Sequence, residues 1–262
     1  SFIGRPPSVT LTLIGGELLV DGDLPDGIRT GDGMLAALED LLSHFESPSI
    51  EGMPPLHGGL MGYLGYDVVR EVEDLPDTPP DDKGFPDGIM SIIGELVAID
   101  HWRQRAILIV NVVVPSEADD AALDAAYDEA VSRLEDLATD GARPLDEPLM
   151  EPPSFDDEPP EVTSSMGPEL YAAAVEAARE HIFAGDIFQV VLSQRFDVEL
   201  DAEPFDVYRV LRQLNPSPYM YFLRYADLSV VGASPEPMVR LLEGRVVSRP
   251  IAGTRRRGRT EA

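Results

Sequence analysis

The segment Ser8-Val9-Thr10-Leu11-Thr12-Leu13-Ile14-Gly15-Gly16-Glu17-Leu18-Leu19-Val20 sets the fold class. Apolar and polar residues alternate along its first half, which is typical of a strand with one buried face. The two glycines can adopt the positive φ angles that a tight hairpin turn needs. The chain is therefore predicted to begin with an antiparallel hairpin.

Helix and strand patterns follow one another through the first part of the chain. Apolar residues from Asp32 to Phe45 recur at helical spacing, and Asp32 is expected to be the N-cap of that helix. Two apolar runs, 89–100 and 105–114, could pair as a hairpin, and an acidic amphipathic helix is expected over 118–138. The predicted fold class is α+β, an α/β sandwich of mostly antiparallel sheets with helices packed outside.

A change in composition divides the chain. Residues 141–162 are rich in Pro, Asp and Glu and show no periodicity, so we interpret them as a linker between domains at 1–140 and 163–262. In the second domain, Ser165 is expected to cap a helix that Gly185 ends. The other expected elements are a helix at 204–214 and strands at 187–198, 219–225, 229–233, 238–242 and 245–249.

Charge and composition exclude several classes of function. The 262 residues carry a net charge of −28, and a hydrophobic content of 44% suffices for a core. Binding to nucleic acid or to anionic lipid needs a basic face, so neither partner is expected. The absence of cysteine excludes disulfides, cysteine-ligated zinc and thiol catalysis. No apolar run reaches the length of a membrane span, so the expected location is the cytoplasm.

Two familiar site patterns are missing. The glycine-rich stretch from Gly58 to Asp67 has neither the spacing nor the lysine of a phosphate-binding loop, so close backbone packing against a sheet is expected there. The four histidines do not stand at spacings that would place two of them on one metal ion. No metal ligand is therefore assigned in this chain. The histidines, listed in full, are His44, His57, His101 and His181.

Three other stretches allow both a structural and a functional interpretation. The expected strand after Gly185 carries Gln189 among apolar residues, which fits either a solvent-facing side or the wall of a ligand cavity. The stretch Asn215–Phe222 combines two prolines with aromatic residues, which fits a connector with core aromatics or a pocket for a flat ligand. Residues Ala233–Pro237 form a tight turn with one carboxylate.

The segment Arg249-Pro250-Ile251-Ala252-Gly253-Thr254-Arg255 reads as a strand that ends in a turn of small residues. A threonine hydroxyl and neighbouring backbone N–H groups at such a turn are good donors to an anion. The segment therefore supplies parts of a carboxylate-binding site.

Taken together, four motifs in this order resemble component I of anthranilate synthase, a chorismate-utilising enzyme. They are Gly185 to Arg195, Asn215 to Met220, Gly232 to Glu236 and Arg249 to Arg255. Ser1-Phe2-Ile3-Gly4 and the Gly58–Asp67 stretch resemble earlier segments of the same family.

The resemblance implies a reaction that converts chorismate and ammonia to anthranilate and pyruvate with Mg²⁺. It implies a glutamine amidotransferase subunit, component II, as the partner that supplies ammonia. By resemblance, Gly253 and Thr254 contact the ring carboxylate of the substrate, and Ala252 and Gln189 lie at the substrate.

Two of these positions separate the subfamilies. Relatives that make isochorismate or salicylate carry a water-activating lysine where this chain has Gln189, and a glutamine amide cannot act as a base. Relatives that make aminodeoxychorismate carry a nucleophilic lysine where this chain has Ala252. Both differences favour direct attack by ammonia, although a sibling enzyme that makes aminodeoxychorismate or isochorismate is the alternative.

The resemblance also implies regulation and incompleteness. Asn215, Pro218, Tyr219 and Met220 match a motif that binds L-tryptophan as feedback inhibitor. The catalytic histidine and the glutamates that hold Mg²⁺ in the family are expected beyond Ala262, so the chain is expected to be truncated and inactive alone. A tryptophan-binding fragment without catalytic activity is a further alternative.

Overall fold

The computed structural model describes every residue except 49, 77–78, 146–147, 155, 157 and 252–262. The chain divides into two compact units, Ser1–Asp146 and Glu147–Ala262. The division falls inside the acidic stretch 141–162. None of the helices in the described part is both long and apolar enough to cross a membrane.

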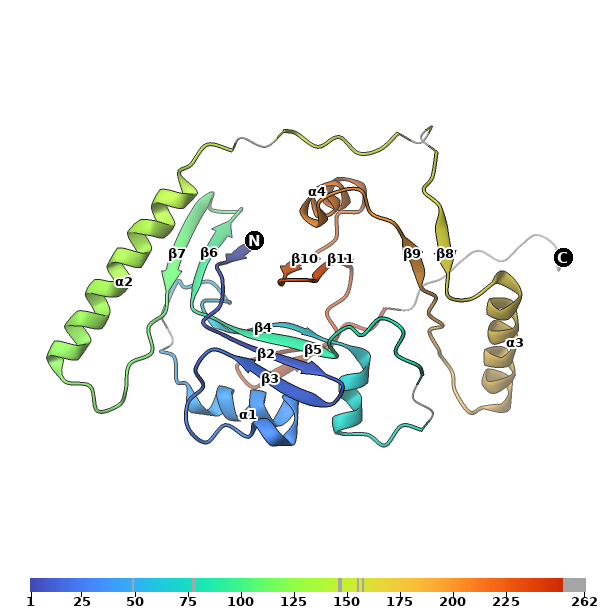
Figure 1. The fold of residues 1–262 in the computed structure, drawn as a ribbon, viewed down its shortest axis with the longest axis horizontal. Coiled ribbons are helices and arrows are strands. Elements are labelled where there is room, and N and C mark those ends of the chain that lie inside the picture. The colour runs from blue at the N-terminus through green and yellow to red at the C-terminus, as the bar shows by residue number, and fades with distance from the viewer. Residues whose placement is uncertain (49, 77–78, 146–147, 155, 157, 252–262) are drawn as a thin grey trace. The chain divides into compact units, whose positions relative to one another are not determined.

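Unit 1 contains two antiparallel sheets (Figure 1). The four-stranded sheet has the order β3-β2-β5-β4, and the three-stranded sheet has the order β1-β6-β7. The strands are β1 (Phe2–Gly4), β2 (Val9–Ile14), β3 (Glu17–Asp21), β4 (Gly59–Leu64), β5 (Gly88–Ile93), β6 (Glu95–Asp100) and β7 (Arg105–Val110). Gly15 and Gly16 turn the β2–β3 hairpin at φ +58° and +79°, as the sequence predicts.

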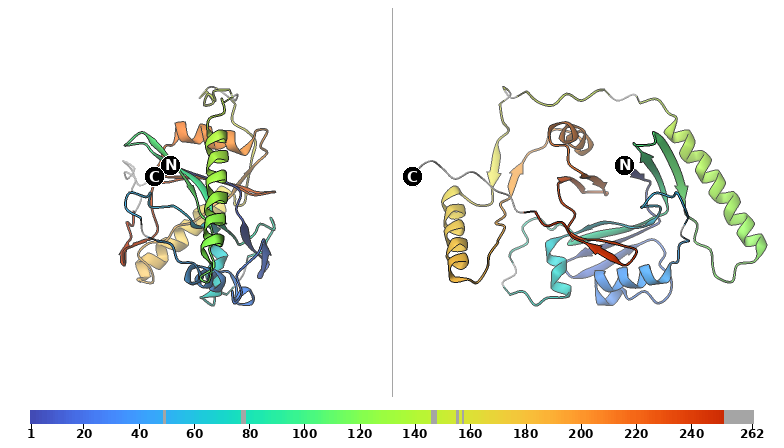
Figure 2. Two further views of the ribbon diagram at one scale, coloured as in Figure 1. Left: turned by 90° about the vertical axis from the view of Figure 1, so that its left-hand side faces the viewer. Right: turned by 180° about the vertical axis from the view of Figure 1, so that it is seen from behind.

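The helices of unit 1 cover these sheets. They are the 3-10 helix η1 (Thr30–Asp32), α1 (Met34–His44), the 3-10 helix η2 (Tyr66–Glu71) and α2 (Asp120–Gly141). Met34, Ala37, Leu38 and Leu41 of α1 are buried with β2 residues in the main core. In both Figure 1 and Figure 2, α2 lies alongside β7. The predicted α+β class with mostly antiparallel sheets is confirmed.

The predicted N-cap of α1 is wrong. Asp32 belongs to η1, and the cap residue is Gly33 at φ +97°, which has no side chain to offer. The carboxylate of Glu71, at the end of η2, instead accepts hydrogen bonds from Met34 N and Leu35 N, both at 2.8 Å. A carboxylate at this position satisfies two free N–H groups and faces the positive end of the helix dipole.

The apolar face of the acidic helix α2 is only partly buried. Leu123 and Tyr127 are 43% and 69% exposed, whereas Leu137 is buried. An ion-pair group near its other end ties α2 to the sheet, because Arg133 reaches Glu95 of β6 at 2.7 Å.

Unit 2 consists of helices and two-stranded antiparallel ribbons. Its elements are β8 (Val162–Ser164), α3 (Pro168–Ala184), β9 (Phe196–Val198), α4 (Pro204–Leu214), β10 (Tyr219–Arg224), β11 (Ser229–Ser234), β12 (Arg240–Leu242) and β13 (Arg245–Val247). The pairs are β8–β9, β10–β11 and β12–β13. Gly185 ends α3 in the left-handed conformation at φ +84°, as predicted, but Ser165 does not cap it. The Ser165 hydroxyl instead accepts a hydrogen bond from Arg195 N.

The buried hydrophobic residues found in the described part of the chain all precede unit 2. They run from Val9 to Leu137, and every described large side chain of unit 2 keeps some exposure. Unit 1 therefore holds the hydrophobic core.

Candidate functional site

The β10–β11 ribbon brings two of the four motifs together. Helix α4 ends at Leu214 and has Asn215 as its C-cap, whose N–H donates to Leu211 O at 2.9 Å. The two prolines that follow lead into β10. In the ribbon, Tyr219 lies opposite Ser234 and Met220 lies opposite Ala233. The Asn215–Met220 motif and the Gly232–Glu236 motif are thus neighbours in one pair of strands.

The two faces of this ribbon differ. Successive strand residues point to opposite sides, so Tyr219 and Tyr221 share one face and Met220 and Phe222 share the other. Phe222 packs on α4, with ring centroids 5.1 Å from Phe205 and 5.8 Å from Tyr208. Tyr219 and Tyr221 are each 44% exposed. The open tyrosine face is the one available to a ligand.

A hydrogen bond that Glu236 accepts connects the Arg249–Arg255 motif to these two. Ser234 closes the turn by donating to Glu236 O at 3.0 Å, and the Glu236 Oε1 atom accepts from Ile251 N at 2.8 Å. The Ser248 hydroxyl also donates to Met238 O at 3.2 Å. The carboxylate therefore holds the backbone immediately before Ala252. Ala252, Gly253 and Thr254 themselves lie outside the described residues.

The remaining motif, Gly185–Arg195, does not form the predicted strand. Of the stretch Ile187–Val198, only Phe196–Val198 is a strand, because its partner β8 offers just three residues for the ladder. Gln189 lies in the irregular segment before it and is exposed. The described contacts of this segment run to β8 and its flank, where Gln194 Nε2 donates to Ser164 Oγ at 2.7 Å and Met166 O at 2.8 Å.

The glycine-rich stretch packs as predicted. It forms η2 and the edge strand β4, and a side chain at Gly62 would overlap the backbone carbonyl of Ile89 on the neighbouring strand. At its start, the amide of Asn111 donates to His57 O at 2.7 Å and to Gly94 O at 3.1 Å. Asn111 thus fixes the entry to β4 against the β5–β6 junction.

Two groups with a raised pKa lie beside this strand. Burial raises the pKa of Asp87, and repulsion from Asp67 and Asp81 raises it further. Burial also raises the pKa of Tyr63, whose hydroxyl donates to Pro86 O at 2.8 Å. The Tyr63 hydroxyl thus ties β4 to the segment before β5, whereas ionised Asp87 is repelled by its carboxylate neighbours.

The described residues do not provide a magnesium site. They contain no group of three or more His, Asp or Glu side chains that could hold a metal ion. A divalent cation with a dianionic substrate needs several oxygen ligands. No step is therefore assigned to Mg²⁺ on these residues.

Sequence reasoning singled out Glu236 as the carboxylate of a tight turn but not its contact with Ile251, and it did not find Asn111. The tight turn at Ala233–Pro237 gave no sign that its carboxylate reaches a segment fifteen residues later, since nothing local encodes that contact. The fixed order of the two motifs along the chain is the signal that could have pointed to this contact.

Comparison with known proteins now adds to this geometry. The family described as chorismate binding enzyme matches residues 27–262. Anthranilate synthase component 1 of Mycobacterium tuberculosis is 40% identical over 270 residues, covering 100% of this chain and 52% of that protein. The Pseudomonas aeruginosa protein of the same name is 38% identical over 270 residues with the same coverage.

A solved structure agrees with these relatives. Anthranilate synthase component I from Streptococcus pneumoniae matches with a TM-score of 0.72 and 28% identity, covering 94% of this chain and 52% of that one. The chain thus spans about half the length of the relatives that it matches. From the motifs, the fold and these matches, we conclude that the chain belongs to the chorismate binding enzyme family.

Proposed function

We propose that the protein to which this chain belongs is the large subunit of anthranilate synthase, a lyase that converts chorismate and ammonia to anthranilate and pyruvate. The observation that carries the proposal is similarity along the whole chain to proteins named anthranilate synthase component 1. Because the chain spans half of those proteins, the activity is proposed for the whole protein.

The identity of two residues favours ammonia as the nucleophile. Gln189 has no basic group to activate water, and Ala252 has no nucleophile that could attack the ring. Ammonia is proposed to come from a glutamine amidotransferase subunit. Mg²⁺ is proposed as the cofactor that neutralises substrate charge, with ligands beyond the described residues.

The substrate carboxylate is proposed to bind at Gly253 and Thr254. The hydrogen bond from Ile251 N to Glu236 supports this, since it anchors the backbone two residues before Gly253. Fixed donors stabilise an anion better than donors that must first be ordered. In this arrangement Glu236 orients the turn, and Thr254 donates to the substrate.

The test is an assay of the protein encoded by the complete reading frame. Chorismate, an ammonium salt and Mg²⁺ should give fluorescent anthranilate as the main product. Thr254→Ala should raise KM for chorismate by about tenfold, the loss of one hydrogen bond to a charged group. Thr260→Ala, a threonine outside the motif, is the matched control. Isochorismate or aminodeoxychorismate as the main product would contradict the proposal.

L-Tryptophan is proposed as a feedback inhibitor that binds at Asn215, Pro218, Tyr219 and Met220. The half-exposed tyrosine face of β10 supports a site for a flat ring there. Calorimetric titration with tryptophan should show saturable heat that Tyr219→Ala abolishes and Tyr127→Ala, an exposed tyrosine on α2, leaves intact. Saturable heat without any turnover by the complete protein would favour the alternative of a regulatory fragment.

A further inference from the structure

The segment that follows helix α3 runs back to the start of that helix. The chain leaves the C-terminal end of α3 at Gly185 and continues to β9. Because β9 pairs with β8, which stands just before α3, the chain has then returned to the point where the helix begins (Figure 1). We call residues 186–194 the return segment, and it carries Gln189.

Gln194 holds one end of the return segment near the start of α3. Its Nε2 atom donates to Ser164 Oγ at 2.7 Å and to Met166 O at 2.8 Å. The next residue, Arg195, donates from its N–H to the Ser165 hydroxyl at 3.0 Å and accepts from Ser165 N at 2.9 Å. Side chain and backbone together fix this end.

His181 holds the other end of the return segment on the last turn of α3. Its Nδ1 atom lies 2.8 Å from Asp186 Oδ2, and the Asp186 N–H donates to His181 O at 3.0 Å. Gly185 makes the turn between the two residues in the left-handed conformation. The first residue of the return segment is therefore attached to the helix that precedes it.

The distance between the two anchors leaves the return segment little slack. A helix of 17 residues is about 25 Å long. The chain from Asp186 to Gln194 can span at most about 26–29 Å when it is fully extended. The segment is therefore expected to run nearly straight between its anchors, and few conformations satisfy both of them.

This arrangement determines where Gln189 lies. Its side chain is exposed, so packing around it does not fix its position. The anchors do, because Gln189 stands between Asp186 and Gln194 on a segment that both ends hold straight. Such placement matters for catalysis, since a displacement of about 1 Å can cost about a hundredfold in rate.

We propose that His181 and Gln194 are positioning residues, which hold the return segment taut and thereby fix Gln189 at the substrate. This inference rests on the proposed function, in which Gln189 lies at the substrate. Neither His181 nor Gln194 has to touch chorismate, because each acts through the backbone that carries Gln189.

The test uses the protein encoded by the complete reading frame and follows the consumption of chorismate. His181→Ala and Gln194→Ala each release one end of the return segment, and each should lower kcat/KM by about tenfold or more. Release of one end already gives the slack, so the double variant should lose little more than either single variant. Two independent structural effects would multiply instead.

Gln189→Ala provides the decisive comparison. If the anchors act through Gln189, then His181→Ala and Gln194→Ala should cost nothing further in a protein that already carries Gln189→Ala. His181→Asn, whose amide can replace Nδ1 beside Asp186, should restore most of the activity that His181→Ala loses. A further tenfold fall in the Gln189→Ala background, or single variants with unchanged kcat/KM, would overturn the proposal.

Thermal stability separates positioning from folding. The His181 and Asp186 side chains are 63% and 59% exposed, and exposed pairs of this kind contribute little to stability. The Tm of His181→Ala should therefore stay close to that of the unchanged protein while kcat/KM falls. A fall in Tm that accounts for the lost activity would contradict a positioning role.

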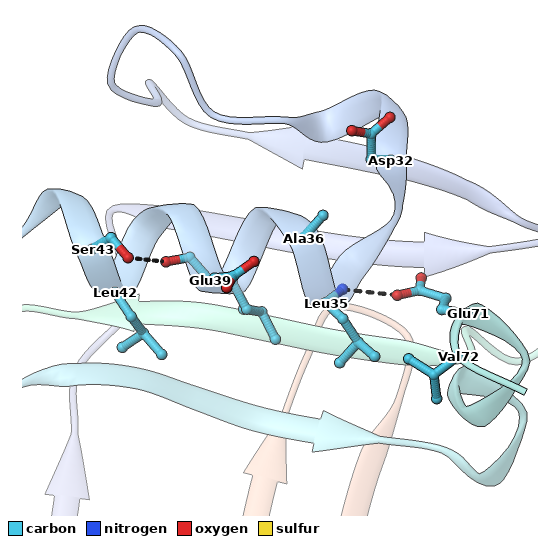
Figure 3. Close-up of a pocket in the computed structure, with 9 residues that line it drawn as sticks. Asp32, Leu35, Ala36, Glu39, Leu42, Ser43, Glu71 and Val72 are labelled. Carbon is cyan, nitrogen blue, oxygen red and sulfur yellow. Dashed lines mark hydrogen bonds between the residues drawn. The ribbon is translucent and has the colours of Figure 1, made fainter.

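Two matched controls remove hydrogen bonds of the same kind elsewhere. Gln213→Ala removes an amide that donates to Met150 O at 3.1 Å, and Ser43→Ala removes a hydroxyl that donates to Glu39 O at 2.8 Å (Figure 3). Both should leave kcat/KM unchanged. A loss in the controls equal to that of the anchor variants would count against the proposal.

The product of the unchanged protein reports separately on the proposed function. A main product other than anthranilate would refute the proposed function, but the comparison among variants would still be made on chorismate consumption. A complete protein that does not consume chorismate would overturn both.

Discussion

Replacing Glu71 by alanine tests how helix α1 is held. The carboxylate accepts hydrogen bonds from Met34 N and Leu35 N at 2.8 Å each, and no other cap side chain is present because the cap residue is Gly33. Loss of an N-cap costs about 0.5–2 kcal/mol, and loss of the favourable charge at the helix N-terminus adds about 0.3–1 kcal/mol. The expected loss of stability is therefore about 2 kcal/mol.

The effect reaches the core, because α1 supplies Met34 and three further buried residues to it. Urea denaturation followed by circular dichroism measures the loss directly. For a unit of this size it corresponds to a fall in Tm of roughly 4–8 °C. Glu71→Gln, which keeps an acceptor but not the charge, should lose about half as much. The matched control is Asp32→Ala, the residue that sequence reasoning puts at the cap. Equal effects of Glu71→Ala and Asp32→Ala would refute this account of the helix.

Three other perturbations should each change the stability of the protein in a definite direction. Because burial and two neighbouring aspartates raise the pKa of Asp87 in the folded state, its ionisation opposes folding, and stability is lost as pH rises through that pKa. Asp87→Asn should therefore raise Tm at pH 7 and have little effect below pH about 4, near the ordinary carboxyl value; a lower Tm at pH 7 would contradict this. Gly62→Ala should cost about 3 kcal/mol or more, because the new methyl group meets the Ile89 carbonyl and backbone cannot move aside cheaply. Thermal melts compared with those of Gly31→Ala, a glycine with open space around it and no positive φ, check this. Raising the salt concentration should increase Tm, because the excess acidic groups behind the net charge of −28 repel one another. Sucrose, which does not screen charge, serves as the comparison. A Tm that does not respond to salt would rule out that repulsion.

Local signals in the sequence predicted much of the fold. The Gly15-Gly16 hairpin, the helical spacing of α1 and the αL glycine at the end of α3 each depend on a few adjacent residues. The cap of α1 was mispredicted because the carboxylate that accepts its N–H hydrogen bonds, Glu71, stands far along the chain, in η2. The strand expected over 187–198 is shorter than predicted for a related reason. Alternation of apolar and polar residues shows that a segment can pair, but it does not show how long the partner strand is.

The candidate site was only partly visible from sequence. The motifs identified the segments, and the pairing of Tyr219 with Ser234 brings two of them together. The contact from Glu236 to Ile251 could not be anticipated, because it depends on a side chain crossing between two turns. The roles of Gln189 and of Ala252, Gly253 and Thr254 stay predictions.

The pairing of β1 with β6 has a consequence for the order in which the molecule is made. Phe2 lies opposite Ala98, so β1 leaves the ribosome well before its partner and stays unpaired while most of unit 1 between them is synthesised. The β2–β3 hairpin has its partner at once and can form during that interval. Pairings between distant segments close late and slow folding. β1 should therefore find its place late in the folding of unit 1, and the nascent chain carries an unpaired strand until β6 has emerged.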